Sequence, residues 1–424
     1  MNPRRSLQRN AGSHLALMSV PLVTGCLLAP GAATAQEALR TAVEGDRSYQ
    51  IRRQQASEPA LPMSWGPVQF SVGASLRLTY DDNVLLSDAN PEEDFIIAPG
   101  VDVGVFYPIT ERSRLSFGIG LAYEIYTEDT RTDRLSLSPN SEVALDFEVG
   151  RSLVTVYDRF SFSQDLLDQG EASDSRNYGG FNNSLGFRVN WVPEPMFVET
   201  GYSWNLFLSS NDEFSELDRT SHQVFLRVGQ VLAERTRWGV EGSASDTTYD
   251  EGERNDFQSV SVGPFLEWQV TEAINLGLRG GWSWTMFDQT GTLVAPEDVS
   301  VPYLGIDASH QLTDSFSHSL SATREVRVGF NSEYIEVLAF RYGFGWQLTD
   351  LINLSAGVFY ELGEEPGFPV DEEYDRYGFN LGVPFRLTDN LSLSFGYQFT
   401  ARDSNFAGRD YTNNRGTATL RYQF

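Results

Sequence analysis

The sequence predicts an all-β protein, namely a transmembrane antiparallel up-and-down β-barrel of about 18 strands, with 16 as the alternative count. Three observations predict this fold. Long segments alternate apolar and polar side chains, short turns alternate with long polar loops, and the chain ends on an aromatic residue, Phe424. Alternation at period two indicates strands, and runs of about 12 to 15 residues suit a tilted crossing of a bilayer better than a soluble sheet.

Composition limits the possible functions. The 424 residues carry a formal net charge of −27 and include no lysine. Nucleic acids bind basic surfaces, so we expect no nucleic-acid partner. The mean hydropathy of −0.30 excludes a bundle of membrane helices. It does not exclude a barrel, whose strands place apolar residues only at alternate positions.

Residues 1–35 have the form of a cleaved signal peptide. Arginines occupy three of the first nine positions, residues 15–29 are apolar, and Ala33-Thr34-Ala35 fits the small-x-small cleavage pattern. The mature chain is therefore expected to start at Gln36. Val23-Thr24-Gly25-Cys26 resembles a lipoprotein box, which offers lipidation of Cys26 as an alternative.

The rest of the chain divides into two parts. Residues 36–66 are polar and rich in Arg and Gln, which predicts a periplasmic extension that is helical or disordered. Residues 67–424 carry the alternating pattern and form the predicted barrel. Cys26 is the single cysteine, so the mature part has no disulfide.

The alternation can be followed strand by strand. One face of a predicted strand consists of Leu115, Phe117, Ile119, Leu121, Tyr123 and Ile125. The residues between them are Ser116, Gly118, Gly120, Ala122 and Glu124. In an outer-membrane barrel the large apolar face points at lipid and ends in aromatic girdles. The small and polar face then lines the lumen.

The connections alternate in length. Leu312-Thr313-Asp314, Leu348-Thr349-Asp350 and Leu387-Thr388-Asp389 are variants of one short turn. Thr and Asp suit such turns because their side chains bond nearby backbone groups. Long polar connections fall between the short ones, at 81–93, 164–176, 209–218, 246–256 and 363–375. Short periplasmic turns and long outer loops are typical of outer-membrane barrels.

The pattern predicts strands that start near 68, 94, 114, 138, 152, 178, 196, 219, 236, 257, 273, 299, 315, 334, 351, 375, 390 and 412. Segments 138–149 and 299–311 alternate least clearly, because Asp146, Glu148 and Asp307 interrupt them. In the last strand Leu420, Tyr422 and Phe424 lie on one face. This ending is similar to the signal that the barrel-assembly machinery reads, and that machinery is an expected partner.

The opening strand carries a more specific pattern. Leu76 to Val84 reads Leu-Arg-Leu-Thr-Tyr-Asp-Asp-Asn-Val. This segment, with Tyr80, Asp81, Asp82 and Asn83, resembles the opening of the β-barrel porin type 2 family. The resemblance implies an outer-membrane barrel over residues 67–424. It also implies an association with exopolysaccharide or capsule genes, and hence with polysaccharide-secretion components, but it does not identify a substrate.

The acidic residues of the loops have two interpretations. We interpret Asp81, Asp82 and Asn83 as the start of a loop, where such side chains form turns. Further acidic clusters lie at 92–94, 212–213, 250–251, 364–365 and 371–373. We interpret them as solvated surface. The alternative for both groups is divalent-cation binding, which would bridge the loops and lipopolysaccharide.

Little in the sequence indicates catalysis. Hydrolytic sites generally need a His or paired carboxylates near a nucleophile. The mature chain has only His222, His310 and His318. The first is predicted near the outside, and the other two face each other across a periplasmic turn as half of a metal site with no third ligand. We therefore expect no enzyme activity, no cofactor and no metal site.

Charged residues at lumen-facing positions are the candidate pore lining. They are Arg77, Glu124, Arg188, Arg279, Arg341, Glu361, Arg386 and Arg421. Arginines opposite carboxylates set a transverse field that selects solutes by charge. The favoured hypothesis is an outer-membrane channel for small polar solutes or for saccharide or exopolysaccharide export. The alternative is a non-conducting barrel, which acts as a scaffold or surface-interaction partner in polysaccharide secretion.

Overall fold

The computed structural model describes residues 63–163, 178–233, 235–292, 297–366 and 371–424. The predicted signal peptide, Cys26 and most of the predicted extension lie outside these residues. Regular structure in the described part is strand, apart from one short 3-10 helix, η2 (Asp212–Leu217). Within this part, no helix has the length and apolar character needed to cross a membrane.

Nineteen strands form a single sheet. Their bounds are β1 (Met63–Trp65), β2 (Val68–Asp81), β3 (Asp94–Thr110), β4 (Ser113–Tyr126), β5 (Arg134–Val149), β6 (Ser152–Ser163), β7 (Gly180–Trp191), β8 (Met196–Ser209), β9 (Arg219–Leu232), β10 (Thr236–Tyr249), β11 (Phe257–Gln269), β12 (Ile274–Phe287), β13 (Val299–Thr313), β14 (Phe316–Arg327), β15 (Ile335–Gln347), β16 (Asn353–Glu365), β17 (Glu372–Arg386), β18 (Leu391–Ser404) and β19 (Tyr411–Gln423).

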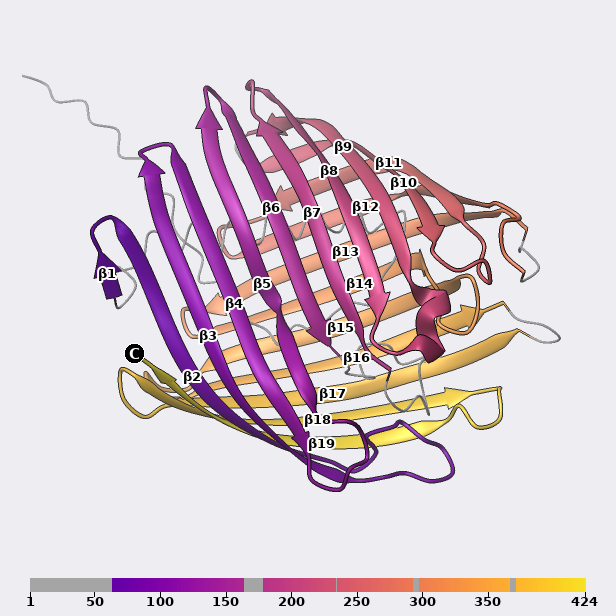
Figure 1. The fold of residues 1–424 in the computed structure, drawn as a ribbon. Coiled ribbons are helices and arrows are strands. Elements are labelled where there is room, and N and C mark those ends of the chain that lie inside the picture. The colour runs from indigo at the N-terminus through magenta and orange to yellow at the C-terminus, as the bar shows by residue number, and fades with distance from the viewer. Residues whose placement is uncertain (1–62, 164–177, 234, 293–296, 367–370) are drawn as a thin grey trace, which may run out of the picture.

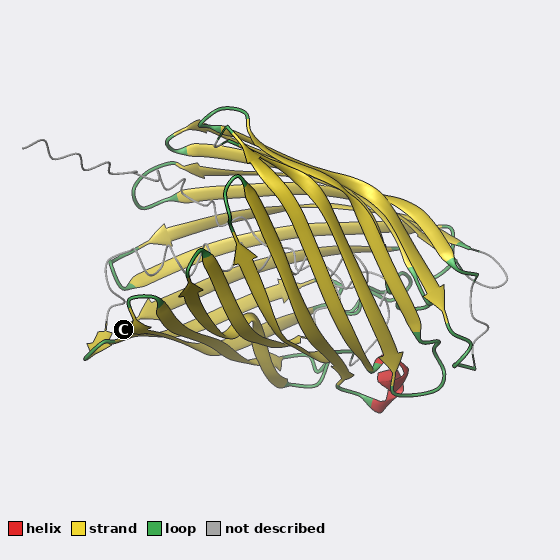
Figure 2. Cartoon of the chain, turned by 90° about the horizontal axis from the view of Figure 1, so that it is seen from above, coloured by secondary structure: helices red, strands yellow, loops and turns green. Residues whose placement is uncertain are grey.

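The sheet closes on itself. Each long strand pairs antiparallel with its neighbours in the chain, and β19 pairs with β2, from Arg415 opposite Asp81 to Gln423 opposite Gly73. The short β1, which falls in the predicted extension, pairs with the start of β2. With β1 set aside, the eighteen long strands make a closed up-and-down barrel whose strands run at a tilt (Figures 1 and 2). The alternative count of 16 is therefore wrong.

The predicted strand starts agree with the structure. Each of the eighteen lies within four residues of an observed start. The largest difference is at β5, predicted from 138 and observed from Arg134. Its pairing shifts register at both edges, between Gly118 and Leu121 against β4 and between Leu137 and Ser141 against β6. Such bulges break the strict alternation of faces, which explains why apolar and polar residues alternate less clearly in this segment.

Strand β13 is irregular for a different reason. Val299 and Tyr303 face inward and are buried, at 8% and 4% exposure. The inner face of this strand is therefore apolar near one end and polar near the other, where Asp307 lies. A face of mixed character weakens the alternation in sequence while leaving the strand intact.

Turns and loops separate to the two ends of the barrel. The short connections and the C-terminus lie at one end, which we call the turn end (Figure 1). The long connections lie at the other, the loop end. In the turns the Thr hydroxyls bond the backbone as predicted, since Thr349 Oγ1 accepts from Leu351 and Ile352 N–H, and Thr388 Oγ1 accepts from Leu391 N–H. By the usual outer-membrane arrangement the turn end is periplasmic.

Candidate pore interior

All eight charged residues selected from the sequence lie at inward-facing strand positions, because their sequence neighbours are the outward apolar residues. Their strands are distributed around the whole barrel. The residues are Arg77 on β2, Glu124 on β4, Arg188 on β7, Arg279 on β12, Arg341 on β15, Glu361 on β16, Arg386 on β17 and Arg421 on β19. Their role in the passage of solutes stays a prediction.

Most of these residues are held in ion pairs. Arg77 Nη2 lies 2.7 Å from Glu124 Oε1, across the intervening β3. Arg421 Nη2 lies 2.5 Å from Asp102 Oδ2. These pairs are partly exposed, with 43% and 50% of the arginine side chains accessible. Their free energy is therefore small, but they fix where each charge lies on the wall.

A second group lies on β15 to β17. The carboxylate of Glu361 is buried between two arginines, with Arg341 Nη2 at 2.5 Å and Arg376 Nη1 at 3.0 Å. Arg386 is exposed at the turn end of β17. Arg279 lies against Gly305 of β13, where a Cβ would clash with its side chain. Glycine at 305 therefore makes room for the arginine.

The largest charged group involves β7 to β11. Glu199 on β8 has no exposed surface. Its carboxylate contacts Arg237 on β10, lies 3.1 Å from Arg227 Nη1 on β9, and lies 3.6 Å from Arg188 Nη2 on β7. Three positive charges therefore surround one carboxylate on the inner wall.

Two further carboxylates balance this group. Arg227 Nε lies 3.2 Å from Glu241 Oε2, and Arg227 Nη2 lies 2.7 Å from Glu267 Oε1. Arg237 Nη1 also reaches Glu267, at 3.0 Å. The group of Arg188, Glu199, Arg227, Arg237, Glu241 and Glu267 thus contains three charges of each sign. We call it the wall network.

Of the six members of the wall network, the sequence analysis predicts only Arg188 as a pore-lining residue. The others occupy the same inward parity in their strands, so the alternation alone contains the signal. What it lacks is the pairing register, which brings Glu199 opposite Arg227, and Arg227 opposite Glu241.

Hydroxyl side chains cover the neighbouring wall of β8 to β12, nearer the loop end. The inward positions there hold Ser203, Ser221, Ser243, Ser245, Thr247, Ser259, Ser261, Ser283 and Thr285. A pocket lined mainly by polar side chains opens on this side of the barrel. Its lining includes Asn182, Asn205, Ser221, Thr247 and Arg219. The amides and hydroxyls can both donate and accept hydrogen bonds, whereas Arg219 only donates.

The opening-strand motif has a structural role at the seam between β2 and β19. Asp81 is fully buried, accepts a hydrogen bond from Asn413 and lies 2.8 Å from Arg415 Nη2. Asp82 Oδ2 accepts from Asn414 Nδ2 at 2.7 Å. Donors of the last strand therefore occupy the oxygens of both carboxylates. This arrangement supports the interpretation as a loop start and leaves few free oxygens to bind a cation.

Asn83 and Tyr80 complete this motif. Asn83 Oδ1 accepts from Ser87 N–H at 2.9 Å, and its Nδ2 donates to the Thr412 carbonyl at 3.0 Å. Tyr80 faces outward and donates to Glu93 Oε2 at 2.5 Å. We call the contacts of residues 81–83 with residues 412–415 the seam clasp.

Several acidic loop residues are not the solvated surface that we expected. Asp94, Glu365 and Glu372 are buried to 2% exposure or less. Asp94 accepts hydrogen bonds from Thr127 and Thr130, while Arg409 contacts both Glu365 and Glu372. These carboxylates hold loops together. Among the described residues, no group of three or more His, Cys, Asp or Glu is placed to hold a metal.

The histidines in the described part of the chain all face outward. His310 Nδ1 and His318 Nε2 lie 3.1 Å apart across the β13–β14 turn, as the sequence predicts. His222 lies at the loop end, where its Nδ1 is 2.7 Å from the Tyr202 hydroxyl. His222 is therefore far along the barrel from the other two, and the described histidines do not share a site.

The outer surface identifies the environment of the barrel. Large apolar side chains are exposed all around it, for example Leu78 at 47%, Phe340 at 43% and Trp346 at 44%. The predicted assembly residues Leu420, Tyr422 and Phe424 lie on this face at 43%, 44% and 53% exposure. A continuous apolar surface outside a closed barrel fits lipid and not water. The chain is a transmembrane β-barrel of the outer membrane.

Comparison with known proteins adds fold likeness only. No family model matches this outer-membrane barrel, and no curated protein matches it. Among solved structures, Pseudomonas aeruginosa OpdK with vanillate is 9% identical with a TM-score of 0.48, covering 84% of this chain and 99% of that one. Pseudomonas aeruginosa OccK2 (OpdF) with glucuronate is 10% identical with a TM-score of 0.48, covering 87% and 100%. Acinetobacter baumannii OccAB3 is 11% identical with a TM-score of 0.48, covering 84% and 99%.

Proposed function

We propose that this outer-membrane barrel is a passive channel for small polar solutes. The observation that carries the proposal is the inner wall, which is polar, hydroxyl-rich and studded with paired charges of both signs. A barrel of eighteen strands is wide enough for an aqueous path. A wall with these groups exchanges hydrogen bonds with water and with polar solutes, which an apolar wall would exclude.

The arrangement of charges on the inner wall indicates which solutes the channel favours. The wall network is balanced, and the inward arginines Arg77, Arg341 and Arg421 pair with carboxylates one or two strands away. Such a wall sets local fields without a large net charge. It therefore favours neutral and zwitterionic polar solutes over strong selection for one ion sign.

Two other forms of the function remain proposals. Saccharide or exopolysaccharide export rests on the resemblance of the Leu76–Val84 segment. A non-conducting barrel, serving as a scaffold or surface partner in polysaccharide secretion, is favoured by apolar contacts across the loop end, described below. Membrane lipid, lipopolysaccharide and the barrel-assembly machinery are proposed partners, and divalent cations at the acidic loops are a further proposal. We propose no enzyme activity.

Single-channel conductance of the refolded protein in planar bilayers tests the proposal. Discrete ohmic steps, with swelling of protein-containing liposomes in isotonic sugar solutions, are the expected result. Heat-modifiable migration on gels provides the folding control. A correctly folded barrel that neither conducts nor admits sugars, in any variant described below, would contradict the channel and favour the scaffold.

A further inference from the structure

An apolar cluster lies at the loop end, where a simple open pore would have water. Its buried members are Leu86, Tyr178, Phe207, Phe214, Leu217 and Tyr411, and Phe330 packs against them. The rings of Tyr178, Phe214 and Phe330 contact one another directly, with centroids 5.1 to 5.9 Å apart. We call these seven residues the mouth cluster.

The members of the mouth cluster come from distant parts of the barrel. Leu86 lies in the β2–β3 loop, Phe214 in the β8–β9 loop and Phe330 in the β14–β15 loop. Each of these loops is six strands away from the other two around the eighteen-stranded barrel. The points where the three loops leave the barrel wall are therefore separated from one another by about one third of the circumference.

This spacing means that the cluster spans the opening. Strands about 4.8 Å apart and tilted by about 40° give eighteen strands a barrel roughly 35 Å across. Side chains that project from the wall cannot bridge such a distance. The three loops must fold inward and meet, and the point where they meet is apolar. An apolar constriction blocks ions and polar solutes because water leaves it.

Buried polar contacts hold the β14–β15 loop in this position. Arg254, at 5% exposure, donates to the carbonyls of Gly329, Phe330 and Ser332 at 3.0, 2.5 and 2.8 Å. One guanidinium thus binds the backbone on both sides of Phe330. The arginine comes from the β10–β11 loop, four strands away.

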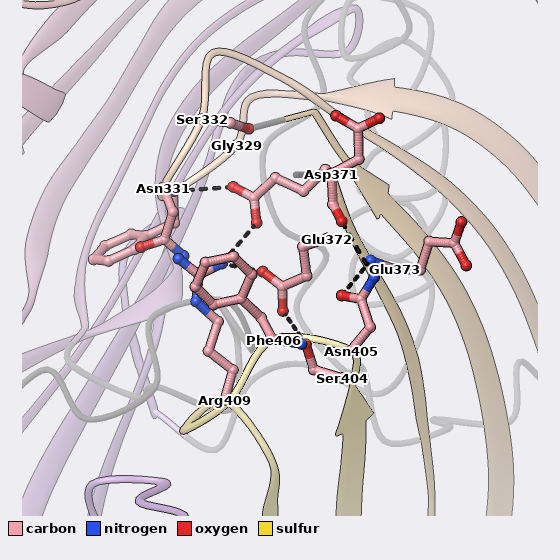
Figure 3. Close-up of polar contacts among 12 residues, drawn as sticks. Gly329, Asn331, Ser332, Asp371, Glu372, Glu373, Ser404, Asn405, Phe406 and Arg409 are labelled. Atoms are coloured by element: carbon pink, nitrogen blue, oxygen red, sulfur yellow. Dashed lines mark hydrogen bonds and ion pairs between the residues drawn. The ribbon is translucent and has the colours of Figure 1, made fainter. Parts of the chain in front are cut away.

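Further contacts support the same loop from both sides. Asn255 donates to Glu333 Oε1 through its backbone N–H at 3.1 Å and its Nδ2 at 2.9 Å. On the other side, Asn331 N–H donates to Glu365 Oε1 at 3.1 Å (Figure 3). Arg409 contacts both Glu365 and Glu372 (Figure 3). The loop is therefore held by specific hydrogen bonds and ion pairs.

We propose that the mouth cluster is the gate of this channel, closed in the structure, and that it opens when residues 328–334 leave their contacts with Arg254 and Asn255. Phe330 is the central barrier residue. This inference rests on the proposed channel function. It differs from that function because an ungated channel would conduct with or without Phe330.

The test compares single-channel recordings of four proteins. The wild type should be mostly closed with brief openings. Phe330→Ser removes two ring contacts of the closed state and should raise the open probability about tenfold or more. Phe95→Ser is the matched control, because Phe95 is an aromatic residue at 58% exposure on the outer face of β3, outside the cluster and its supporting contacts. It should behave as the wild type does.

The fourth protein carries Asn255→Cys and Glu333→Cys. The only natural cysteine, Cys26, belongs to the predicted signal peptide, so the new pair has no competitor in the mature chain. Oxidation should abolish openings, and reduction should restore them in the same molecules. This comparison needs no assumption about the folding of Phe330→Ser.

The outcomes separate the gate from the channel. Stable open steps in the wild type, unchanged by Phe330→Ser and by oxidation of the cysteine pair, would overturn the gate and leave the channel standing. Absence of conduction in all four folded proteins would overturn both. A rise confined to Phe330→Ser, together with redox control in the cysteine pair, supports both.

Discussion

Glu199 lies on the inner wall with no exposed surface, between arginines of three other strands. Phe197 and Phe265 lie beneath the guanidinium groups of Arg237 and Arg227, with ring centroids 3.9 and 4.1 Å away. Charges in such surroundings are poorly hydrated, so each depends on its partners. Removing one partner leaves buried charge uncompensated, which costs more than the pair itself contributes.

We expect Glu199→Gln to destabilise the barrel by about 3 kcal/mol, because three arginines would share the two remaining carboxylates of the wall network. Denaturant unfolding of the refolded protein, followed by the heat-modifiable gel shift, measures this change. Glu272→Gln is the control, because Glu272 pairs with Arg235 in an exposed turn, with 79% of its side chain accessible. Equal stability of the two variants would show that the wall network contributes no more to the free energy of unfolding than an exposed ion pair does.

At the scale of elements, the seam between β2 and β19 is the pairing with the longest separation in sequence. Backbone hydrogen bonds join the two strands, and the seam clasp adds side-chain contacts at the loop end. Asp81 accepts hydrogen bonds from both Asn413 and Arg415. The Tyr-Asp-Asp-Asn motif therefore makes physical sense as a device that fixes the register of first and last strands.

We expect Asp81→Ala to speed unfolding of the barrel, since it removes the buried acceptor that Asn413 and Arg415 share, at a cost of about 2 kcal/mol. The unfolding rate in urea gives the measurement. Asp88→Ala serves as the control, because Asp88 is exposed in the same loop. If both variants unfolded at the wild-type rate, the clasp would be dispensable for closure.

The end of β19 allows a prediction about assembly. Phe424 is 53% exposed on the outer face and contacts the ring of Tyr422. An exposed terminal ring contributes little to packing, so its proposed value lies in recognition by the assembly machinery. Phe424→Ala should lower the amount of barrel in the outer membrane of cells but leave refolding into detergent unchanged. A matching loss of refolding in the purified variant would instead indicate a packing role.

Most strands could be predicted from the sequence because each strand shows its two environments residue by residue. Lipid on one side and water on the other impose the alternation, as with Phe340 and Tyr342 around Arg341. β5 shows the limit, since its bulges depend on how it pairs with β4 and β6. The alternation also predicts that Glu199 faces inward, but which three arginines contact it depends on the pairing register of the strands.

At the scale of the whole molecule, the mouth cluster could not be derived from the sequence. Its residues lie in otherwise polar loops, and large apolar side chains such as Leu86, Phe214 and Phe330 were the available signal. That these loops meet depends on the number of strands and on closure, which place them a third of the circumference apart. Convergence of this kind is a property of the assembled barrel and of no single segment.

The balance of charge on the inner wall leads to a prediction for the whole channel. Arg279 and Arg341 lie three strands apart on the inner wall, on β12 and β15, and both face inward. Replacing both with Ser removes two positive charges and leaves Glu361 with Arg376 as its remaining arginine contact. The lumen then loses two positive charges and becomes more negative.

A unit charge about 10 Å from the solute path contributes ~0.4 kcal/mol in water before screening, with opposite sign for cations and anions, so each substitution should raise the cation-to-anion permeability ratio by up to about fourfold. Reversal potentials across a salt gradient, recorded during openings, give the ratio. Arg235→Ser removes an exposed arginine at a turn and controls for overall charge. An unchanged ratio in the double variant would place Arg279 and Arg341 away from the path of the ions, and a larger effect at low salt would confirm that their charge acts through space.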